Sequence, residues 1–285
     1  MFKLLNANFY KLKKDKIFLV MILISFVLSL FAVYRYQSMV DSIVIDRIIT
    51  EYMANYFGII IAIFISVYVG KEYTGGTIRN KIISGHKRMH IYLANLIISI
   101  FAGLVLEAIY IGTVLLFGTK IYGNLQQLMS LGEIFLYTIL IVTVYCSIYN
   151  LITMFCSDAS IALVVCIILF VTMFVVNSIV SQKVNTSKYI VSTYYDEQGQ
   201  HVIDKQPNPN YPEEKELRIY KTIYFLIPTG QADVVHMACS ESSIIDEEKV
   251  NKIKENLTEM PKYALGLILV SNIVGLYFFK RQEIR

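Results

Sequence analysis

The sequence predicts an all-α membrane protein with six transmembrane helices, an N-terminal amphipathic helix and an α+β extracellular insertion between spans five and six. In this chain 55% of the residues are hydrophobic and only 17% are charged, which is typical of proteins that lie largely in a bilayer. The apolar residues gather in runs long enough for a helix to cross a hydrocarbon core of about 30 Å. The strand-like alternation of an outer-membrane barrel is absent from these runs.

The apolar runs define the predicted organisation of the chain. The six spans are expected at residues 17–34, 52–69, 91–118, 132–155, 159–181 and 262–279. A membrane domain therefore covers residues 17–181 and is completed by the last span. The remaining segments are an N-terminal helix at 1–16, an outer domain at 182–261 and a tail at 280–285.

The first 16 residues carry an amphipathic pattern. Phe2, Leu5, Phe9 and Leu12 recur at spacings of three and four, and most of the lysines fall between them. This spacing predicts a helix that lies along the inner membrane surface. A simple cationic anchor for the first span explains the same lysines, so both interpretations stay open.

Lysine and arginine positions predict the orientation, because short cytoplasmic loops carry an excess of these residues. They gather before the first span, between spans two and three, and after the last span: Lys3, Lys11, Lys13, Lys14, Lys16, Lys71, Arg79, Lys81, Lys87, Arg88, Lys280, Arg281 and Arg285. The two short connections on the other side hold only Arg35, Arg47 and Lys120. We therefore expect a multi-pass cell-membrane protein with both termini cytoplasmic and residues 182–261 extracellular. The net charge of +4 then reflects orientation, and no nucleic-acid partner is expected.

The large insertion has its own local signals. Residues 189–205, "YIVSTYYDEQGQHVIDK", have two β-prone arms around a glycine-containing turn, which predicts a hairpin. Two helices are expected at 213–226 and 246–257, each led by acidic residues. The hydrophobic stretch 220–228 is also a candidate to enter the outer leaflet. On the inner side, the short connection after span four places Asp158 where it can cap the fifth helix.

Two polar or small-residue patterns lie inside the spans. A stripe of small residues spaced by four predicts a close helix-packing face, and it consists of Gly58, Ala62, Ser66 and Gly70. Glu107 is an intramembrane carboxylate, which is costly in lipid and therefore a candidate functional group. A neutral acid hydrogen-bonded to a neighbouring helix, or a hydrated position near the outer interface, would explain Glu107 equally well.

Signals of enzymatic chemistry are weak, so no catalytic, cofactor-binding or metal residue is predicted. No P-loop motif occurs, and its nearest approach, "GTVLLFGTK" at 112–120, has the wrong spacing and lies in a span. His86 and His90 are four residues apart but have no third ligand nearby. The stretch "EEKELR", which contains Glu213, Glu214 and Arg218, fits a pattern of membrane-embedded proteases. It lies in a polar outer loop, however, whereas those enzymes need it inside the membrane.

The segment between spans two and three, "KEYTGGTIRNKIISGHKRMHIYLANLI", carries the most specific pattern. It has an acidic residue after the span, then Gly-Thr-x-Arg, then Gly-x-x-Arg before the third span. With the six-span plan, it resembles the inner loop of permease subunits of ABC-2 type transporters, specifically the small six-span type of Gram-positive bacteria. In that family this loop forms a coupling helix on a separate ATPase, braced by the N-terminal helix. The resemblance assigns a coupling segment at 71–90 and these ATPase-coupling residues: Glu72, Gly76, Thr77, Arg79, Asn80, Gly85 and Arg88.

The residues themselves support a mechanical role for this segment. Gly75, Gly76 and Gly85 permit sharp turns at its two ends. Its cations, among them Arg79 and Lys81, can pair with acidic groups of a partner or with lipid head groups. A plain positive-inside loop explains the charge, but it explains the glycines and the length less well.

The resemblance also implies partners and a substrate class. A second permease chain, identical or homologous, and two soluble P-loop ATPase subunits would complete the transporter, in contact with membrane lipid. ATP and Mg would bind to the partner ATPases and no cofactor to this chain. The implied activity is export or extraction of a hydrophobic or amphipathic substrate, such as an antimicrobial peptide, a drug or a lipid, and so antibiotic resistance. The long insertion departs from the brief re-entrant hairpin of the shortest family members, so the substrate stays open.

Two other functions remain as alternatives. A membrane sensor or accessory protein would use residues 182–261 to recognise an extracellular peptide without driving ATP turnover. A membrane-embedded protease would depend on Glu213, Glu214 and Arg218.

Overall fold

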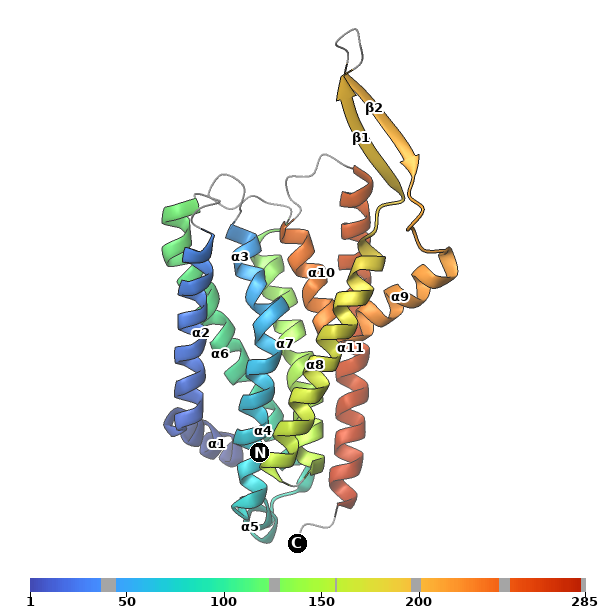
Figure 1. Cartoon of the computed structure of the whole chain (residues 1–285). Coiled ribbons are helices and arrows are strands. Elements are labelled where there is room, and N and C mark those ends of the chain that lie inside the picture. The colour runs from blue at the N-terminus through green and yellow to red at the C-terminus, as the bar shows by residue number, and fades with distance from the viewer. Residues whose placement is uncertain (37–44, 123–128, 157, 196–200, 241–246, 283–285) are drawn as a thin grey trace.

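The computed structural model describes residues 1–36, 45–122, 129–156, 158–195, 201–240 and 247–282. It is a bundle of long helices with two short helices at one end and a two-stranded sheet at the other (Figure 1). Six helical stretches are long and apolar enough to span a membrane, as the sequence predicts. The elements that form them are α2 (Lys16–Arg35), α3 (Ile45–Tyr52) with α4 (Gly58–Thr74), α6 (Arg88–Tyr122), α7 (Leu131–Cys156), α8 (Ala159–Asn185) and α11 (Glu247–Arg281).

The other described elements are shorter. They are α1 (Phe2–Lys14), α5 (Thr77–Ile83), β1 (Tyr189–Tyr195), β2 (His201–Pro207), α9 (Glu214–Leu226) and α10 (Pro228–Ser240). Of these, α9 and α10 pack within the bundle. α1, α5 and the last turn of α11 lie at the same end of the bundle, which we call the α5 end (Figure 1). The opposite end, from which the strands project, is the hairpin end.

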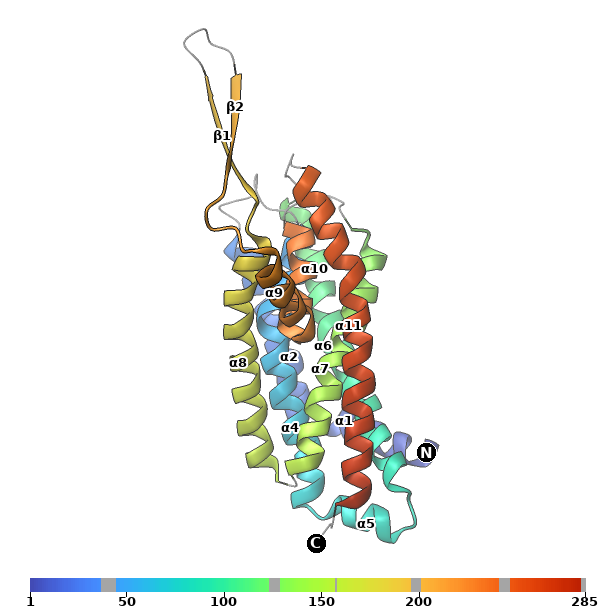
Figure 2. The ribbon, with the colours of Figure 1, turned by 90° about the vertical axis from the view of Figure 1, so that its right-hand side faces the viewer.

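The second span is the centre of the bundle. In the most apolar stretch of this span, 72% of the residues are buried inside the protein. The corresponding share is 22% in α8 and 17% in α11. A π-helical turn, Met53–Phe57, joins α3 to α4. Figure 2 shows α8 and α11 on the periphery, with α9 crossing between them. The exposed apolar surfaces of α8 and α11 are therefore available to lipid or to another chain, as is that of α2, where 33% of the most apolar stretch is buried.

The small-residue stripe packs α4 against α8. A β-carbon on Gly70 would lie 2.7 Å from the backbone Cα of Ala159, and one on Gly58 would meet the ring of Phe170. Ser66 Oγ lies 3.4 Å from the carbonyl oxygen of Ala162 in α8. Ala62 has no exposed surface. The stripe therefore serves contact within one chain, with α8 as its partner.

Gly70→Ala should destabilise the protein by about 1–3 kcal/mol, because the added methyl group meets backbone that cannot rotate away. Gly112→Ala is the matched control, since a β-carbon at Gly112 in α6 meets nothing within 4 Å. That change should be neutral or should stabilise by about 0.5–1 kcal/mol, because alanine favours a helix more than glycine does. Thermal unfolding of both purified variants in detergent measures the difference, and equal melting temperatures would contradict the close packing.

The N-terminal helix forms, and its fully buried residues share only Leu12 with the predicted apolar face. Its buried residues are Leu4, Asn8 and Leu12, whereas Phe2 is 85% exposed. Phe9 is half-buried and meets Phe101 edge to face, with ring centroids 4.9 Å apart. The apolar spacing alone could not locate this face, because a polar residue, Asn8, lies at its centre.

Residues 182–261 do not form one separate outer domain in the described parts of the chain. The predicted hairpin is confirmed, with β1 and β2 paired antiparallel from Tyr189 opposite Pro207 to Tyr195 opposite His201. The helix predicted at 213–226 is confirmed as α9. The helix predicted at 246–257 instead continues through Pro261 into the last span, as α11.

An unpredicted helix, α10, follows α9 and turns back into the bundle. At this turn Thr229 Oγ1 donates a hydrogen bond of 3.0 Å to the carbonyl oxygen of Met173, which lies near the middle of α8. Gln231 Nε2 donates to the carbonyl oxygen of Phe225 at 2.8 Å. Together α9 and α10 form a re-entrant helical hairpin that packs against α3, α7, α8 and α11. Its apolar segments are too short to cross a bilayer, which is typical of re-entrant elements.

Candidate functional site: the α5 end

A sharp double turn carries α5 between the second and third spans. Gly76 precedes α5 with a φ of 65°, and Gly85 follows it with a φ of 82°. Both angles lie in the left-handed region, which glycine adopts without steric cost. Gly75, expected to share this role, has an ordinary φ of −84°. The two left-handed glycines therefore place a sharp turn on each side of α5, which is a short rigid helix between them.

Glu72, near the end of α4, is the anchor of α5. Its carboxylate is 1% exposed and accepts hydrogen bonds from Lys81 Nζ of α5, at 2.8 Å to Oε1 and 2.9 Å to Oε2. Lys11 Nζ of α1 lies 3.2 Å from Oε1. Asn95 Nδ2 of α6 donates to Oε2 at 3.0 Å. One buried carboxylate therefore joins α1, α4, α5 and α6.

Asn8 closes this cluster from the side of α1. Its Nδ2 donates to Asn95 Oδ1 at 2.9 Å, and its Oδ1 accepts from Lys81 Nζ at 3.1 Å. Its backbone carbonyl oxygen accepts from the hydroxyl of Tyr68 in α4 at 3.0 Å. We call Asn8, Lys11, Tyr68, Glu72, Lys81 and Asn95 the Glu72 cluster.

The Glu72 cluster fixes the position of α5 through electrostatics. A buried charge is tolerated only when it is paired and its remaining hydrogen-bonding capacity is used. Both oxygens of Glu72 have partners, and those partners come from three different helices. Displacing α5 from α4 therefore requires a new partner for the Glu72 carboxylate.

Two further contacts tie the segment to the last part of the bundle. Arg88, the first residue of α6, donates to backbone carbonyl oxygens at the end of α11, at 3.0 Å for Phe279 and 3.2 Å for Lys280, and also binds the carbonyl oxygen of Gln282. Tyr73 donates its hydroxyl to the carbonyl oxygen of Met154 in α7 at 2.6 Å. The segment is thus connected to α7 and α11 as well as to the Glu72 cluster.

The outer face of α5 is open. Arg79, Asn80 and Ser84 are exposed, and the side chain of Ile83 is 73% exposed. Thr77, at the first position of α5, is half-buried, and Ile78 turns inward with no exposed surface. This face therefore offers a cation, an amide and a large apolar side chain to a partner.

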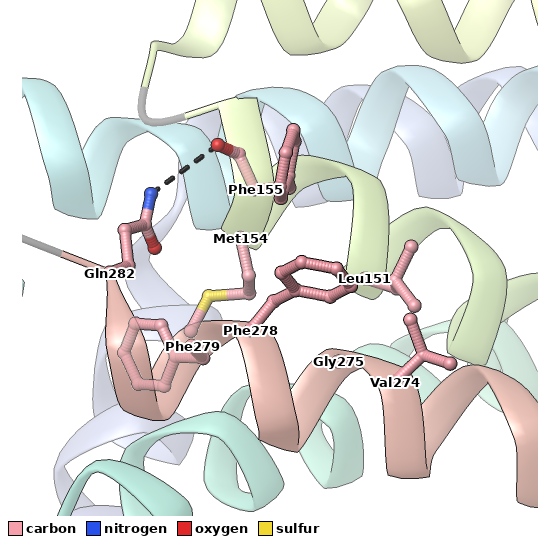
Figure 3. Close-up of a pocket in the computed structure, with 8 residues that line it drawn as sticks. All are labelled: Leu151, Met154, Phe155, Val274, Gly275, Phe278, Phe279 and Gln282. Carbon is pink, nitrogen blue, oxygen red and sulfur yellow. Dashed lines mark hydrogen bonds between the residues drawn. The ribbon is translucent and has the colours of Figure 1, made fainter.

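An apolar groove lies beside the site, between α7 and α11 (Figure 3). Its volume is about 240 Å³, and Met154 on its wall also contacts Asn95 of the Glu72 cluster, with Nδ2 and Sδ 3.8 Å apart. Gln282 reaches across from α11 and donates to the carbonyl oxygen of Phe155 at 3.3 Å, as Figure 3 shows. The groove thus separates two helices that are bridged at the α5 end.

Glu107 lies far from α5, in the part of α6 nearer the hairpin end. It is 2% exposed, and its Oε2 has no hydrogen-bond partner within the described part of the chain. Its electrostatic neighbours are Tyr52 and Tyr110, whose rings stack with centroids 4.4 Å apart. Glu107 therefore faces the bundle interior and takes no part in the Glu72 cluster.

Two half-buried titratable groups of α10 are Asp233 and His236. Asp233 accepts hydrogen bonds from the hydroxyls of Ser181, at 2.5 Å, and Tyr224, at 2.8 Å. Burial raises the pKa of Asp233 above its ordinary value, against the effect of these hydrogen bonds. Burial lowers the pKa of His236 from 6.5 to about 4, and the nearby positive charge of Arg47 acts in the same direction.

His236 should make the protein less stable in acid. Because its folded-state pKa lies below the ordinary value of 6.5, the unfolded chain binds more protons, and stability falls as the pH drops from about 6.5 towards 4. A His236→Gln variant should lose less melting temperature than the parent over this range, since glutamine does not titrate. Thermal melts at stepped pH values measure the difference, and parallel curves would contradict it.

The remaining candidate residues are not assembled into a site. His86 lies in the turn before α6 and His90 within α6, so the two do not share a helix face. No group of three metal-ligating side chains occurs among the residues that the structure describes. Glu213, Glu214 and Arg218 are exposed at the start of α9.

A comparison with protein families bears directly on this arrangement. The model of the ABC-2 family transporter proteins matches residues 27–284, which includes the double turn, α5 and all but the first part of the six-span bundle. The chain belongs to the ABC-2 transporter family. A search of curated proteins found no match. Membership of the ABC-2 family gives the chain the role of a multi-pass permease and implies an ABC ATPase subunit as its partner.

Sequence reasoning located the ABC-2 segment but not the contacts that hold it. Glu72 was expected among the coupling residues, yet it is buried, and Lys81 pairs with it instead of facing outward. Asn8, Asn95 and Ile83 were not selected, because an isolated asparagine or isoleucine carries no signal of its own. The one available hint was the spacing of Leu4, Asn8 and Leu12, which places all three on one helix face.

Proposed function

We propose that the chain is the permease subunit of an ATP-driven exporter or extractor of hydrophobic or amphipathic substrates, with α5 as its contact to a separate ATPase. The exposed face of α5 carries this proposal: Arg79, Asn80 and Ile83 point outward from a helix that internal contacts on both sides hold in place. A short helix transmits motion only when it is tied firmly to the spans. The Glu72 cluster, Tyr73 and Arg88 provide such ties.

The cationic α5 end supports a cytoplasmic location for this face. Lysines of α1, the cations of the segment 71–88 and Lys280 and Arg281 all belong to this end, and such residues favour the inner side of a membrane. In this orientation both termini are cytoplasmic, and the β1–β2 hairpin lies outside.

A hollow beside α11 supports an amphipathic substrate. It has a volume of about 570 Å³, with Leu226, Leu267 and Val270 on its apolar lining and Glu259 and Lys262 also bordering it. An apolar body with a polar end matches this lining, as in ligand pockets generally. A membrane-active peptide, a drug or a lipid has this character. Transport in this class requires a second permease chain, identical or homologous, and two ATPase subunits that bind ATP and Mg.

The decisive experiment has two parts. A tagged chain purified in mild detergent should bring down a soluble P-loop ATPase, and candidate peptides or lipids should raise the ATPase rate of the complex. A Ser84→Cys variant should react with a membrane-impermeant thiol reagent only in inverted vesicles, and Lys215→Cys on α9 only in intact cells. The unmodified chain, whose described cysteines are buried or half-buried, measures the background. Labelling of Ser84→Cys from outside would refute the proposal.

The sensor alternative makes a different prediction for the same complex. A sensor would bind its peptide without raising ATP turnover, and Arg79→Glu would leave its output intact. The protease alternative requires Glu213, Glu214 and Arg218, which are exposed and distant from any described histidine pair. Changing all three to alanine with activity retained would remove it.

A further inference from the structure

The two cations beside Glu72 are not equivalent. Lys81 binds both carboxylate oxygens, at 2.8 and 2.9 Å, and its side chain is 13% exposed. Lys11 approaches only Oε1, at 3.2 Å, and its side chain is 36% exposed. Lys11 also lies over the ring of Tyr68, 4.4 Å from the ring centroid, and 3.5 Å from the Tyr68 carbonyl oxygen. Lys81 is therefore the main partner of Glu72, and Lys11 is held beside the carboxylate by groups of α4.

A static cluster needs only one of these cations. Glu72 carries one negative charge, which Lys81 alone neutralises, so Lys11 leaves the cluster with an excess positive charge. Excess charge at a partly buried site is unfavourable. Some other interaction or role must therefore offset the free-energy cost of placing Lys11 here. The two lysines belong to different elements: Lys81 lies on α5, between the left-handed Gly76 and Gly85, whereas Lys11 lies on α1.

We propose that Lys11 is a reserve counter-ion for Glu72, which allows α5 to move away from α4 without leaving a buried carboxylate unpaired. When α5 shifts, Lys81 leaves with it, and Lys11 closes onto both oxygens of Glu72. The charge on α4 stays paired throughout. The inference rests on the proposed function only for the claim that ATP-driven motion displaces α5.

The pairing itself can be tested without any ATPase. Melting temperatures of Lys11→Met, Lys81→Met and the double variant form a mutant cycle. If each lysine can serve Glu72 when the other is absent, the double variant should lose more melting temperature than the two single losses added together. Additive losses would overturn the proposal, because they would show that the two lysines do not substitute for each other.

The role in motion is tested in the intact permease–ATPase complex in liposomes. Lys11→Met keeps the Lys81–Glu72 pair, so the complex should still assemble, but stimulated ATP turnover should fall roughly tenfold or more because α5 is no longer released easily. Lys13→Met is the matched control. It removes the same charge from an exposed position on α1, and turnover should stay at the parent level.

A second substitution that restores ATP turnover distinguishes an effect of Lys11 on the motion of α5 from an effect on the folded structure. Adding Glu72→Gln to Lys11→Met removes the carboxylate that needs a counter-ion, so turnover should recover towards that of Glu72→Gln alone. A Lys11→Met variant that turns over like the parent, or one that Glu72→Gln does not rescue, would overturn the inference. A parent complex that never assembles with an ATPase would instead contradict the proposed function, and the mutant cycle would still test the pairing.

Discussion

Glu72→Ala should be among the most destabilising single changes in this protein, with a loss of about 3–5 kcal/mol in the free energy of unfolding. Alanine leaves the ammonium group of Lys81 buried without its carboxylate, and it removes the acceptor of Asn95 as well. The contacts of α1, α5 and α6 to the end of α4 would weaken together. A large fall in melting temperature in detergent, with loss of purified yield, would show this.

Two comparison variants make the Glu72 result specific. Glu216→Ala in α9 removes an exposed carboxylate and should leave the melting temperature nearly unchanged. Glu72→Ala combined with Lys81→Met removes both charges and should recover part of the lost stability, because the unpaired ammonium costs more than the missing pair. A Glu72→Ala variant as stable as Glu216→Ala would mean that the Glu72 cluster does not hold α5.

Ile83→Asp should abolish coupling while leaving the fold intact. Because the Ile83 side chain is 73% exposed, aspartate costs little in the isolated permease. In a docked complex the isoleucine would be buried, and loss of a central apolar contact typically costs about 2 kcal/mol or more, which is roughly 30-fold in affinity. Arg79→Glu should act in the same direction, since it reverses the charge that the exposed face of α5 offers to a partner.

The measurement for Ile83→Asp is the amount of ATPase retained by the tagged permease, together with its melting temperature. Ile219→Asp is the matched control, because Ile219 on α9 is 59% exposed at the other side of the molecule. It should retain the ATPase at the parent level. An Ile83→Asp permease that also keeps its ATPase would show that α5 is not the docking helix.

The sequence was sufficient for the parts of the fold that depend on local pattern. Six apolar runs predicted six spans, alternating β-prone residues predicted the β1–β2 hairpin, and Asp158 caps α8 as expected, accepting from the backbone N–H of Ser160 at 2.8 Å. These features follow from hydrophobicity, periodicity and capping chemistry, each of which acts over a few residues.

The parts that could not be predicted depend on contacts between distant segments. α10 begins with Pro228 and contains Gly230, so its local pattern indicates a loop, and burial against α3, α7 and α8 is what makes it a helix. Lys81 was expected on the surface, because a lysine in a polar loop is usually solvated. It turns inward because Glu72 of α4 and Asn8 of α1 accept hydrogen bonds from its Nζ, while Asn95 of α6 donates to the same Glu72 carboxylate.

The way Arg88 holds the last helix has a practical consequence for anyone who alters the chain. Its guanidinium group binds main-chain oxygens of Phe279, Lys280 and Gln282, so this contact depends on where the backbone of the last helix ends, while the side chains of Phe279 and Gln282 make separate contacts with Tyr92 and Phe155. Deletions that reach back to Phe279 should therefore loosen the contact between α6 and α11 in two ways, because they remove the carbonyl acceptors of Arg88 and also the buried Phe279 ring.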